Sequence, residues 1–336
     1  MKIDGALMSA GIEDAGRQAK AQEEIGYDGL YSFEGPHDPF FPLALASQST
    51  ERLELGTGVA IAFARNPMIC AQIAQDLQRL SRGRFILGLG TQIRPHIEKR
   101  FSQTWSKPAA RMREFVQAIR AIWLSWSDGG RLDFRGEFYS HTLMTPMFNP
   151  GPNPFGDPRI FLAGVGPLMT QVGGEVADGF YVHPLNSRRS LKDLTLPALE
   201  RGLAASGRSR EDFEICCQTI VCLGRTPEQV ETARRKARTQ IAFYGSTPAY
   251  RVILDLHGWG ELQPRLNRMT KSGQWAEMPD LIDDEMLDAI AISGTPSEVG
   301  AGLVERHGDL CERTGLGLYN EAGPEAVAEL IGAAKG

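Results

Sequence analysis

The 336-residue sequence contains no apolar run long enough to cross a membrane and no excess of basic residues. A membrane-spanning helix needs about 20 consecutive apolar residues. The N-terminal segment includes Asp4 and lacks the apolar stretch of a secretory signal. The net charge of -5 argues against nucleic-acid binding, which calls for a basic surface. We therefore expect a protein that binds neither membranes nor nucleic acids.

Cysteine is scarce, with five residues in the chain. An odd, small number in a large chain favours a reducing compartment, so we expect a cytoplasmic protein. Cys216, Cys217 and Cys222 lie in a β-branched apolar run, where neighbouring side chains point to opposite faces of a strand. We therefore interpret these three cysteines as buried thiols.

Metal-binding and nucleotide-binding motifs are also missing. Neither the P-loop pattern nor G-x-G-x-x-G occurs. His96 has no second histidine four residues away, and Glu34, His37 and Asp38 lie in a proline-bounded loop. We expect no metal.

What the sequence does contain is a regular alternation of apolar, strand-like runs and helical patterns. The expected strands are 2–8, 27–34, 52–63, 84–90, 159–164, 178–184, 212–224 and 287–294; the expected helices are 12–26, 38–50, 66–83, 107–127, one from 167, 189–206, 226–243 and 296–307. Such alternation predicts a parallel sheet, and eight repeats predict a closed (β/α)₈ barrel of the α/β class. No linker divides the chain, so we expect one domain over 1–336.

Two segments interrupt the alternation. Residues 131–158 look like a small hairpin followed by a proline-rich loop. The insertion at about 244–286 is longer than an ordinary connection and contains Tyr244, Tyr250, Trp259 and Trp275. It is interpreted as a lid over the barrel mouth, or equally as a structural flap or dimer contact.

Polar residues and glycines gather where the expected strands end, which is where barrels of this kind carry their active sites. They are Glu34, His37 and Asp38; Gly58, Val59 and Arg65; Gly90, Thr91, Gln92, His96 and Arg100; Gly164 and Gly166; and His183. The segment 163–170, "AGVGPLMT", places two glycines before a helix that starts at Pro167. Bare backbone amides at a helix N-terminus bind anions, although a tight turn would also account for these glycines.

Four segments together resemble the bacterial luciferase-like superfamily: "YDGLYSFEGPHDPF", "LELGTGVAIAFARNP", "RLSRGRFILGLGTQI" and "AGVGPLMTQVGGEVADGF". Within it the chain is most similar to oxidoreductases that use the deazaflavin coenzyme F420. The resemblance implies a (β/α)₈ barrel with insertions, FMN or F420 bound at the strand C-termini, and a homodimer. It also implies a non-prolyl cis peptide bond at Gly58–Val59.

Residue by residue, the resemblance places Gly90, Thr91 and Gln92 beside the cofactor, His37 beside its ring and His183 near the substrate. Relatives that oxidise sugar phosphates have an acidic glutamate near the position of Gln92, so we do not expect that activity. The strand ends and the resemblance together give these candidate cofactor-binding residues: Glu34, Gly58, Val59, Gly90, Thr91, Gln92, His96, Gly164, Val165, Gly166, Pro167 and Leu168.

The function expected is hydride transfer between F420 and a small, apolar substrate, with His37 first and His183 second as the proton-exchanging residue. An FMN-dependent monooxygenase and a non-catalytic flavin-binding barrel are the alternatives. A cofactor-free hydrolase would need paired carboxylates, and Glu34 has only Asp38 for a partner.

Overall fold

The computed structural model describes residues 1–7, 11–320 and 322–336. Among these residues, eight parallel strands close into a ring, because β10 pairs with both β9 and β12. In ring order they are β1 (Lys2–Ala6), β2 (Gly29–Ser32), β3 (Glu54–Thr57), β5 (Phe85–Gly90), β8 (Arg159–Gly164), β9 (Gly179–Val182), β10 (Glu214–Leu223) and β12 (Arg313–Leu318). The short strand β4 (Ala60–Ile61) continues alongside β5. The expected (β/α)₈ barrel is confirmed.

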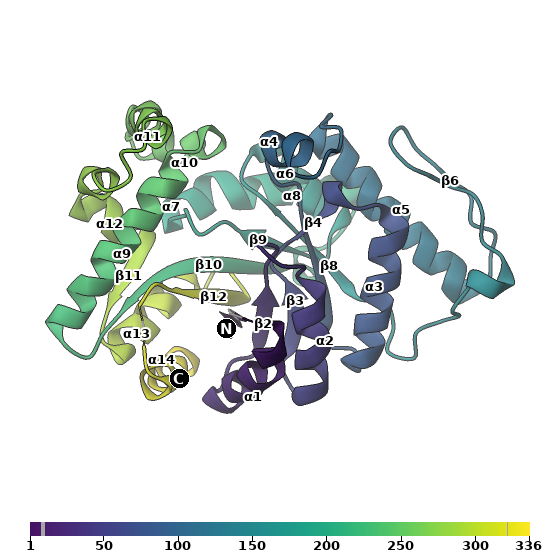
Figure 1. Cartoon of the computed structure of the whole chain (residues 1–336), viewed down its shortest axis with the longest axis horizontal. Helices are drawn as coiled ribbons and strands as arrows, with labels where there is room; N and C mark the ends of the chain where they lie inside the picture. Colours follow the sequence, from purple (N-terminus) through teal and green to yellow (C-terminus); the bar gives the residue numbers. More distant parts are fainter. Residues whose placement is uncertain (8–10, 321) are drawn as a thin grey trace.

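Helices surround this ring on the outside (Figure 1). The larger ones are α1 (Ala15–Ile25), α2 (Phe40–Ser49), α3 (Pro67–Leu80), α5 (Pro108–Asp128), α6 (Pro167–Val176), α8 (Leu196–Ser206), α9 (Pro227–Gly245), α13 (Pro296–His307) and α14 (Pro324–Lys335). Local signals in the sequence set their starts. The side chain of Asn66 accepts a hydrogen bond from the N–H of Ile69, and Pro67 occupies the first turn of α3, where no amide hydrogen is needed.

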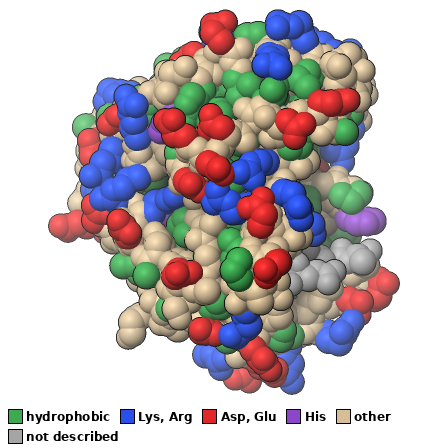
Figure 2. Space-filling view, turned by 90° about the vertical axis from the view of Figure 1, so that its left-hand side faces the viewer, with side chains coloured by type: hydrophobic (Ala, Val, Ile, Leu, Met, Phe, Trp, Pro, Cys, Tyr) green, Lys and Arg blue, Asp and Glu red, His purple; other side chains and the backbone are tan. Residues whose placement is uncertain are grey.

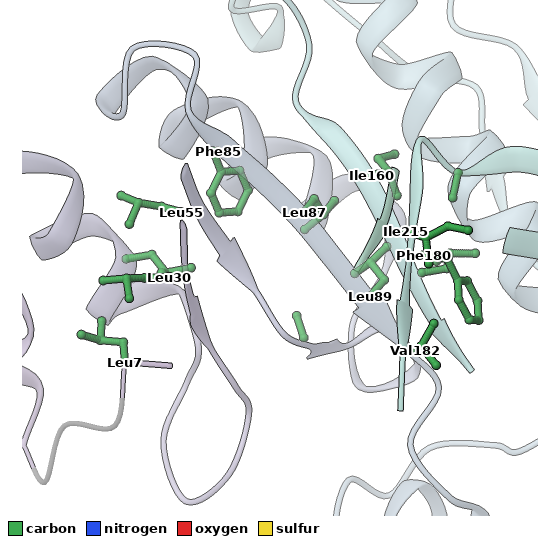
Figure 3. Packing of buried hydrophobic residues seen from close by; sticks show 14 of the residues in the cluster. Leu7, Leu30, Leu55, Phe85, Leu87, Leu89, Ile160, Phe180, Val182 and Ile215 are labelled. Atoms are coloured by element: carbon green, nitrogen blue, oxygen red, sulfur yellow. The ribbon is translucent and has the colours of Figure 1, made fainter. Parts of the chain in front are cut away.

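Side chains along each strand alternate between the helices and the interior of the ring. Leu30, Phe85 and Leu87 belong to the large cluster that packs against the helices (Figure 3). Tyr31 and Tyr181 belong to a smaller cluster with Ile86, Phe161 and Cys216. These five residues come from five different strands of a closed ring, so they can meet only inside it.

The interior is filled by charged groups near the N-terminal ends of the strands. The guanidinium of Arg313 donates to both carboxylate oxygens of Asp4, at 2.6 and 2.8 Å, and neither side chain is exposed. It also donates to Glu54 at 2.8 Å and Glu214 at 3.1 Å. Because this end is occupied, a ligand that uses the ring must approach the C-terminal ends.

The sequence placed the eighth strand wrongly. Residues 287–294 were expected to complete the ring, but they contain the end of α12 (Asp284–Ile290) and the short strand β11 (Ala291–Gly294). β11 pairs only with the C-terminal half of β10, whereas β12 closes the ring. The sequence of β12, RTGLGL, starts with arginine and has two glycines, so it lacks an apolar run. The short helix α4 (Arg94–Lys99) was not expected either.

The interpretation of three buried thiols is wrong for one of them. Cys217 forms a disulfide with Cys311, 94 residues further along the chain, while Cys216 and Cys222 are free and buried. Spacing along the sequence could not reveal a partner so distant.

The insertion has a small core of its own. Helices α10 (Arg251–Leu256) and α11 (Leu262–Lys271) pack with α9 and α12 around apolar residues such as Ile241, Leu266 and Met286. This cluster also includes Ile220 of β10 and packs against Val165 in the β8–α6 loop. The insertion therefore borders the C-terminal rim of the ring.

The expected hairpin is present as β6 (Phe134–Arg135) and β7 (Ser140–His141). Figure 2 shows acidic and basic side chains interspersed on the face at the left of Figure 1. Arg234 of α9 pairs with Asp284 and Asp288, at 2.7 and 2.6 Å. Across the described residues, none of the helices combines the length and the apolar character that a membrane span requires.

Candidate functional site

The turn between β8 and α6 presents bare backbone amides at the rim. Gly166 is the N-cap residue of α6, and Pro167 follows in the first turn. The N–H groups of Leu168 and Met169 are among the first in the helix, which have no acceptor within it. A Cβ atom at Gly166 would meet nothing within 4 Å, so the space before the helix is open. This geometry suits an anionic group such as a phosphate.

On the other side of the rim, two carboxylates hold an arginine. Glu34 accepts hydrogen bonds from the N–H of Ile61 at 2.7 Å and from Arg65 at 2.6 Å. Asp38 accepts from the same guanidinium at 2.9 Å. These contacts tie the β2–α2 loop to the segment after β4, which gives Glu34 a positioning role in the loop that carries His37.

His37 lies in this loop and is exposed. The loop is also held from the neighbouring rim segment, since Arg100 donates to the backbone oxygen of Gly35 at 2.6 Å. His96, on the first turns of α4, is likewise exposed. Both imidazoles can therefore reach a ligand from solvent, and their roles stay predictions.

Between these loops, the rim is formed by the segments that follow β3 and β5. The peptide bond Gly58–Val59 is cis, as the resemblance implied. Gly90, at the end of β5, lies against Val59, because a Cβ there would come within 2.7 Å of its Cγ2. In the next turn the hydroxyl of Thr91 donates to the backbone oxygen of Gln92, whose side-chain oxygen accepts from the N–H of Ile93. Val59 and Gly90 are therefore neighbours at the rim, and the cofactor-lining roles of the expected residues stay predictions.

His183 follows β9 and is half-buried among aromatic rings. Its ring centroid lies 4.2 Å from that of Tyr250 and 4.6 Å from that of Tyr244, both in the insertion. Burial lowers the pKa of His183 to about 3, so the imidazole is neutral at pH 7. Its Nδ1 atom accepts a hydrogen bond from the N–H of Leu185, at 3.1 Å.

That hydrogen bond assigns the proton of the neutral ring to Nε2. A neutral imidazole has one donor and one acceptor nitrogen, and here Nδ1 is the acceptor. His183 is therefore built to donate a hydrogen bond from Nε2. Asn186 fixes the loop by donating to the backbone oxygens of His183 and Gln218, each at 2.8 Å.

The two candidate histidines lie on opposite sides of the ring. His37 follows β2, and His183 follows β9. Three strands of the ring separate β2 from β9 in either direction: β3, β5 and β8 on one side, and β1, β12 and β10 on the other. A flat ligand across the mouth would therefore lie between them.

Sequence reasoning missed two rim residues because it missed β12. Tyr319 directly follows that strand, and its pKa is raised mainly by burial and further by Tyr244. Asn320 donates to the backbone oxygen of Leu223 at 2.6 Å, and its buried side-chain oxygen has no partner among the described residues. The sequence signal that could have revealed Tyr319 and Asn320 as rim residues was their polar character directly after the Gly-Leu alternation of β12.

The chain is thus a closed parallel barrel with free amides at its C-terminal rim, at the start of α6. The model of the family described as luciferase-like monooxygenase matches residues 1–313. The chain belongs to this family and is an oxidoreductase, as the sequence predicted.

Individual relatives are similar over most of their length. An uncharacterized protein of Mycobacterium tuberculosis is 52% identical over 327 residues, which cover 97% of this chain and 96% of that protein. The 5,10-methylenetetrahydromethanopterin reductase of Archaeoglobus fulgidus is 28% identical over 291 residues, covering 83% and 82%. The solved coenzyme F420 dependent tetrahydromethanopterin reductase from Methanopyrus kandleri shares the fold, with a TM-score of 0.80 over 98% of this chain and 96% of that one, at 18% identity.

Proposed function

We propose that the protein is an F420-dependent oxidoreductase that acts on a small, neutral, largely apolar substrate. The observation that carries the proposal is the rim itself, where the space at Gly166 is open beside free amides at the start of α6 and Gly90 lies against Val59. Similarity to reductases of the same family supports F420 as the cofactor. When bound, F420 supplies or accepts a hydride at C5 of its deazaflavin ring.

The residues present fit such a group. The amides of Leu168 and Met169 would hold its phosphate, and Val59 with Gly90 would lie against its ring. The segment Gly164–Pro167 has glycine at positions 164 and 166, so a long anionic tail could follow its backbone. The remaining candidates, Thr91, Gln92 and His96, would border the same ligand.

The residues near His183 favour a neutral substrate. The pKa of His183 is shifted by burial alone, and that of Tyr250 by burial and then by Tyr244, so no charged side chain acts strongly on either group. The Nε2–H of His183 would donate a hydrogen bond to a carbonyl or hydroxyl oxygen of the substrate. The tyrosine rings would cover its apolar part and exclude water.

His37 remains the proposed proton donor or acceptor. It is exposed and lies opposite His183, so it could exchange a proton with solvent while the substrate is held from the other side. This division of roles differs from the expectation that either histidine could move the proton, because a group with a pKa of about 3 is a poor proton carrier at pH 7.

An FMN-dependent monooxygenase is the second candidate, favoured by the description of the matching family. Titrating the purified protein with F420 and with FMN, followed by cofactor fluorescence, separates the two. We expect saturable binding of F420 and much weaker binding of FMN. Tight binding of FMN alone would overturn the proposal, and turnover of an electron acceptor with F420 would exclude a non-catalytic barrel.

The insertion is proposed to act as a lid, and the protein to form a homodimer in the cytoplasm. Tyr244 and Tyr250 connect the insertion to His183 at the rim. Hydrogen exchange in α10 and α11 should slow when substrate binds, and unchanged exchange would contradict a lid. Sedimentation analysis of the full chain should give twice the monomer mass of 36.9 kDa.

A further inference from the structure

A second cluster of reactive side chains lies away from the barrel mouth. Cys217 of β10, Cys311 just before β12 and His307 at the end of α13 are all buried, with 0%, 6% and 0% exposure. One ligand atom from each lies within 4.8 Å of the other two. Cys217 pairs in register with Thr314, the second residue of β12, so the cluster is at the N-terminal end of the ring.

A chain of hydroxyl groups fixes the proton on the imidazole of His307. The hydroxyl of Thr314 donates to the backbone oxygen of Cys217 at 2.8 Å, and it lies 2.9 Å from that of Thr219. The hydroxyl of Thr219 can donate to that of Thr314 or, at 3.4 Å, to the backbone oxygen of Cys217. With its one proton used in this way, it accepts from Nε2 of His307, 3.0 Å away. The proton therefore sits on Nε2, and Nδ1 carries a bare lone pair.

In the disulfide form, the lone pair on Nδ1 of His307 has no partner among the described residues. The side chain is nevertheless fully buried. A buried polar atom without a partner costs about 1–3 kcal/mol.

Two thiolates and a neutral imidazole nitrogen form a donor set for soft metal ions. A ligating histidine characteristically donates its other N–H to a fixed acceptor, which is the role of Thr219 here. We propose that Cys217, Cys311 and Nδ1 of His307 form a buried site for one thiophilic metal ion, Zn²⁺ or Cu⁺, that opens when the disulfide is reduced.

The disulfide form and the metal-bound form exclude each other, because both use the sulfur atoms of Cys217 and Cys311. A cellular dithiol breaks the bond between the two sulfur atoms, gives two protein thiols and is itself oxidised to a disulfide. The metal ion then displaces the two thiol protons, which pass to solvent, and binds both sulfur atoms and Nδ1. Since Cu⁺ accepts three ligands, the protein supplies its full set, whereas Zn²⁺ would add one water.

The test compares the reduced and oxidised full-length protein. After reduction with dithiothreitol and its removal under nitrogen, Co²⁺ is added as a spectroscopic probe, followed by Zn²⁺ or Cu⁺ in competition. We expect one equivalent of Co²⁺ with thiolate charge-transfer absorption in the reduced protein, displaced by the thiophilic ion, and no such absorption in the oxidised protein. Displacement by Zn²⁺ or by Cu⁺ distinguishes the two ions.

Variants locate the ion. Cys311→Ser and His307→Gln should weaken binding at least about 10-fold, the usual cost of losing a ligand or its support. Cys222→Ser is the matched control, since Cys222 is another buried cysteine of β10 outside the cluster, and it should bind as the parent does.

A second readout holds even if the variants fail to fold. In the reduced parent protein, bound metal should protect Cys217 and Cys311 from alkylation while leaving the modification of Cys70 and Cys222 unchanged, as measured by peptide mass spectrometry. The proposal fails if the folded, reduced protein binds no metal, if binding survives in Cys311→Ser, or if the two cysteines are not protected.

Discussion

The backbone N–H of Leu185 donates to Nδ1 of His183, 3.1 Å away, and so makes Nε2 the donor nitrogen of the neutral ring. We expect His183→Ala to lower kcat/KM about 10–100-fold, the loss of one hydrogen bond to substrate. The Kd for F420 should not change. Steady-state kinetics and cofactor titration check both, and unaltered kcat/KM would remove His183 from substrate binding.

His37→Ala should lower kcat about 10²–10⁴-fold if His37 exchanges the proton. His141→Ala is the matched control, because His141 lies in the β6–β7 hairpin and not after a rim strand, and it should retain most of the activity. Single-turnover kinetics with bound F420 separate the chemical step from product release. Near-normal turnover of His37→Ala would assign the proton transfer to another group.

Gly166→Asp should weaken F420 binding by placing a carboxylate where the phosphate is proposed to bind. Aspartate is a favoured N-cap residue and the backbone at Gly166 is extended, so α6 should remain folded. Gly332→Asp adds the same charge at an exposed position of α14 and should bind F420 normally. Fluorescence titration at two salt concentrations measures the effect, and equal affinity of the two variants would contradict the phosphate site.

Arg313→Met should lower the free energy of unfolding by about 3–5 kcal/mol, because it leaves the buried carboxylate of Asp4 without its partner. Arg17→Met removes an exposed partner of Asp14 and should leave the free energy of unfolding nearly unchanged. Urea unfolding monitored by circular dichroism gives both values. Equal losses would mean that the buried pair contributes no more than the exposed one.

Acid should destabilise the protein in a defined range. The pKa values of His183 and His307 are lowered to about 3 in the folded chain, against about 6.5 when unfolded. Between these values the unfolded state binds more protons, so the free energy of unfolding falls as the pH falls from 6.5 towards 3. The slope is at most about 1.4 kcal/mol per pH unit for each histidine. Urea unfolding of His183→Gln across this range should show a smaller slope than the parent.

The sequence predicted most of the fold because buried parallel strands are apolar runs and the surrounding helices carry clear start signals, such as Asn66 with Pro67. It failed at β12, whose arginine and glycines conceal a strand. Arg313 is needed inside the ring for Asp4, a contact between residues 309 positions apart that no local pattern reveals.

The candidate site was predicted as a set of residues but not as an arrangement. Gly90, Gly166 and His183 were found from their positions after strands. The proton position on His183 depends on the turn to Leu185 and on rings in the insertion, and the pairing of Cys217 with Cys311 depends on the adjacency of β10 and β12. Such long-range contacts exist only once the chain has folded.

Strand β10 serves two partners on one edge: its N-terminal half pairs with β9 in the ring and its C-terminal half pairs with β11, next to the insertion. The strand that follows the insertion therefore pairs with β10 beyond the part that closes the barrel. Related chains could exchange this module, and with it the choice of substrate, without rebuilding the cofactor platform, which makes α10 and α11 a natural target for altering specificity by grafting.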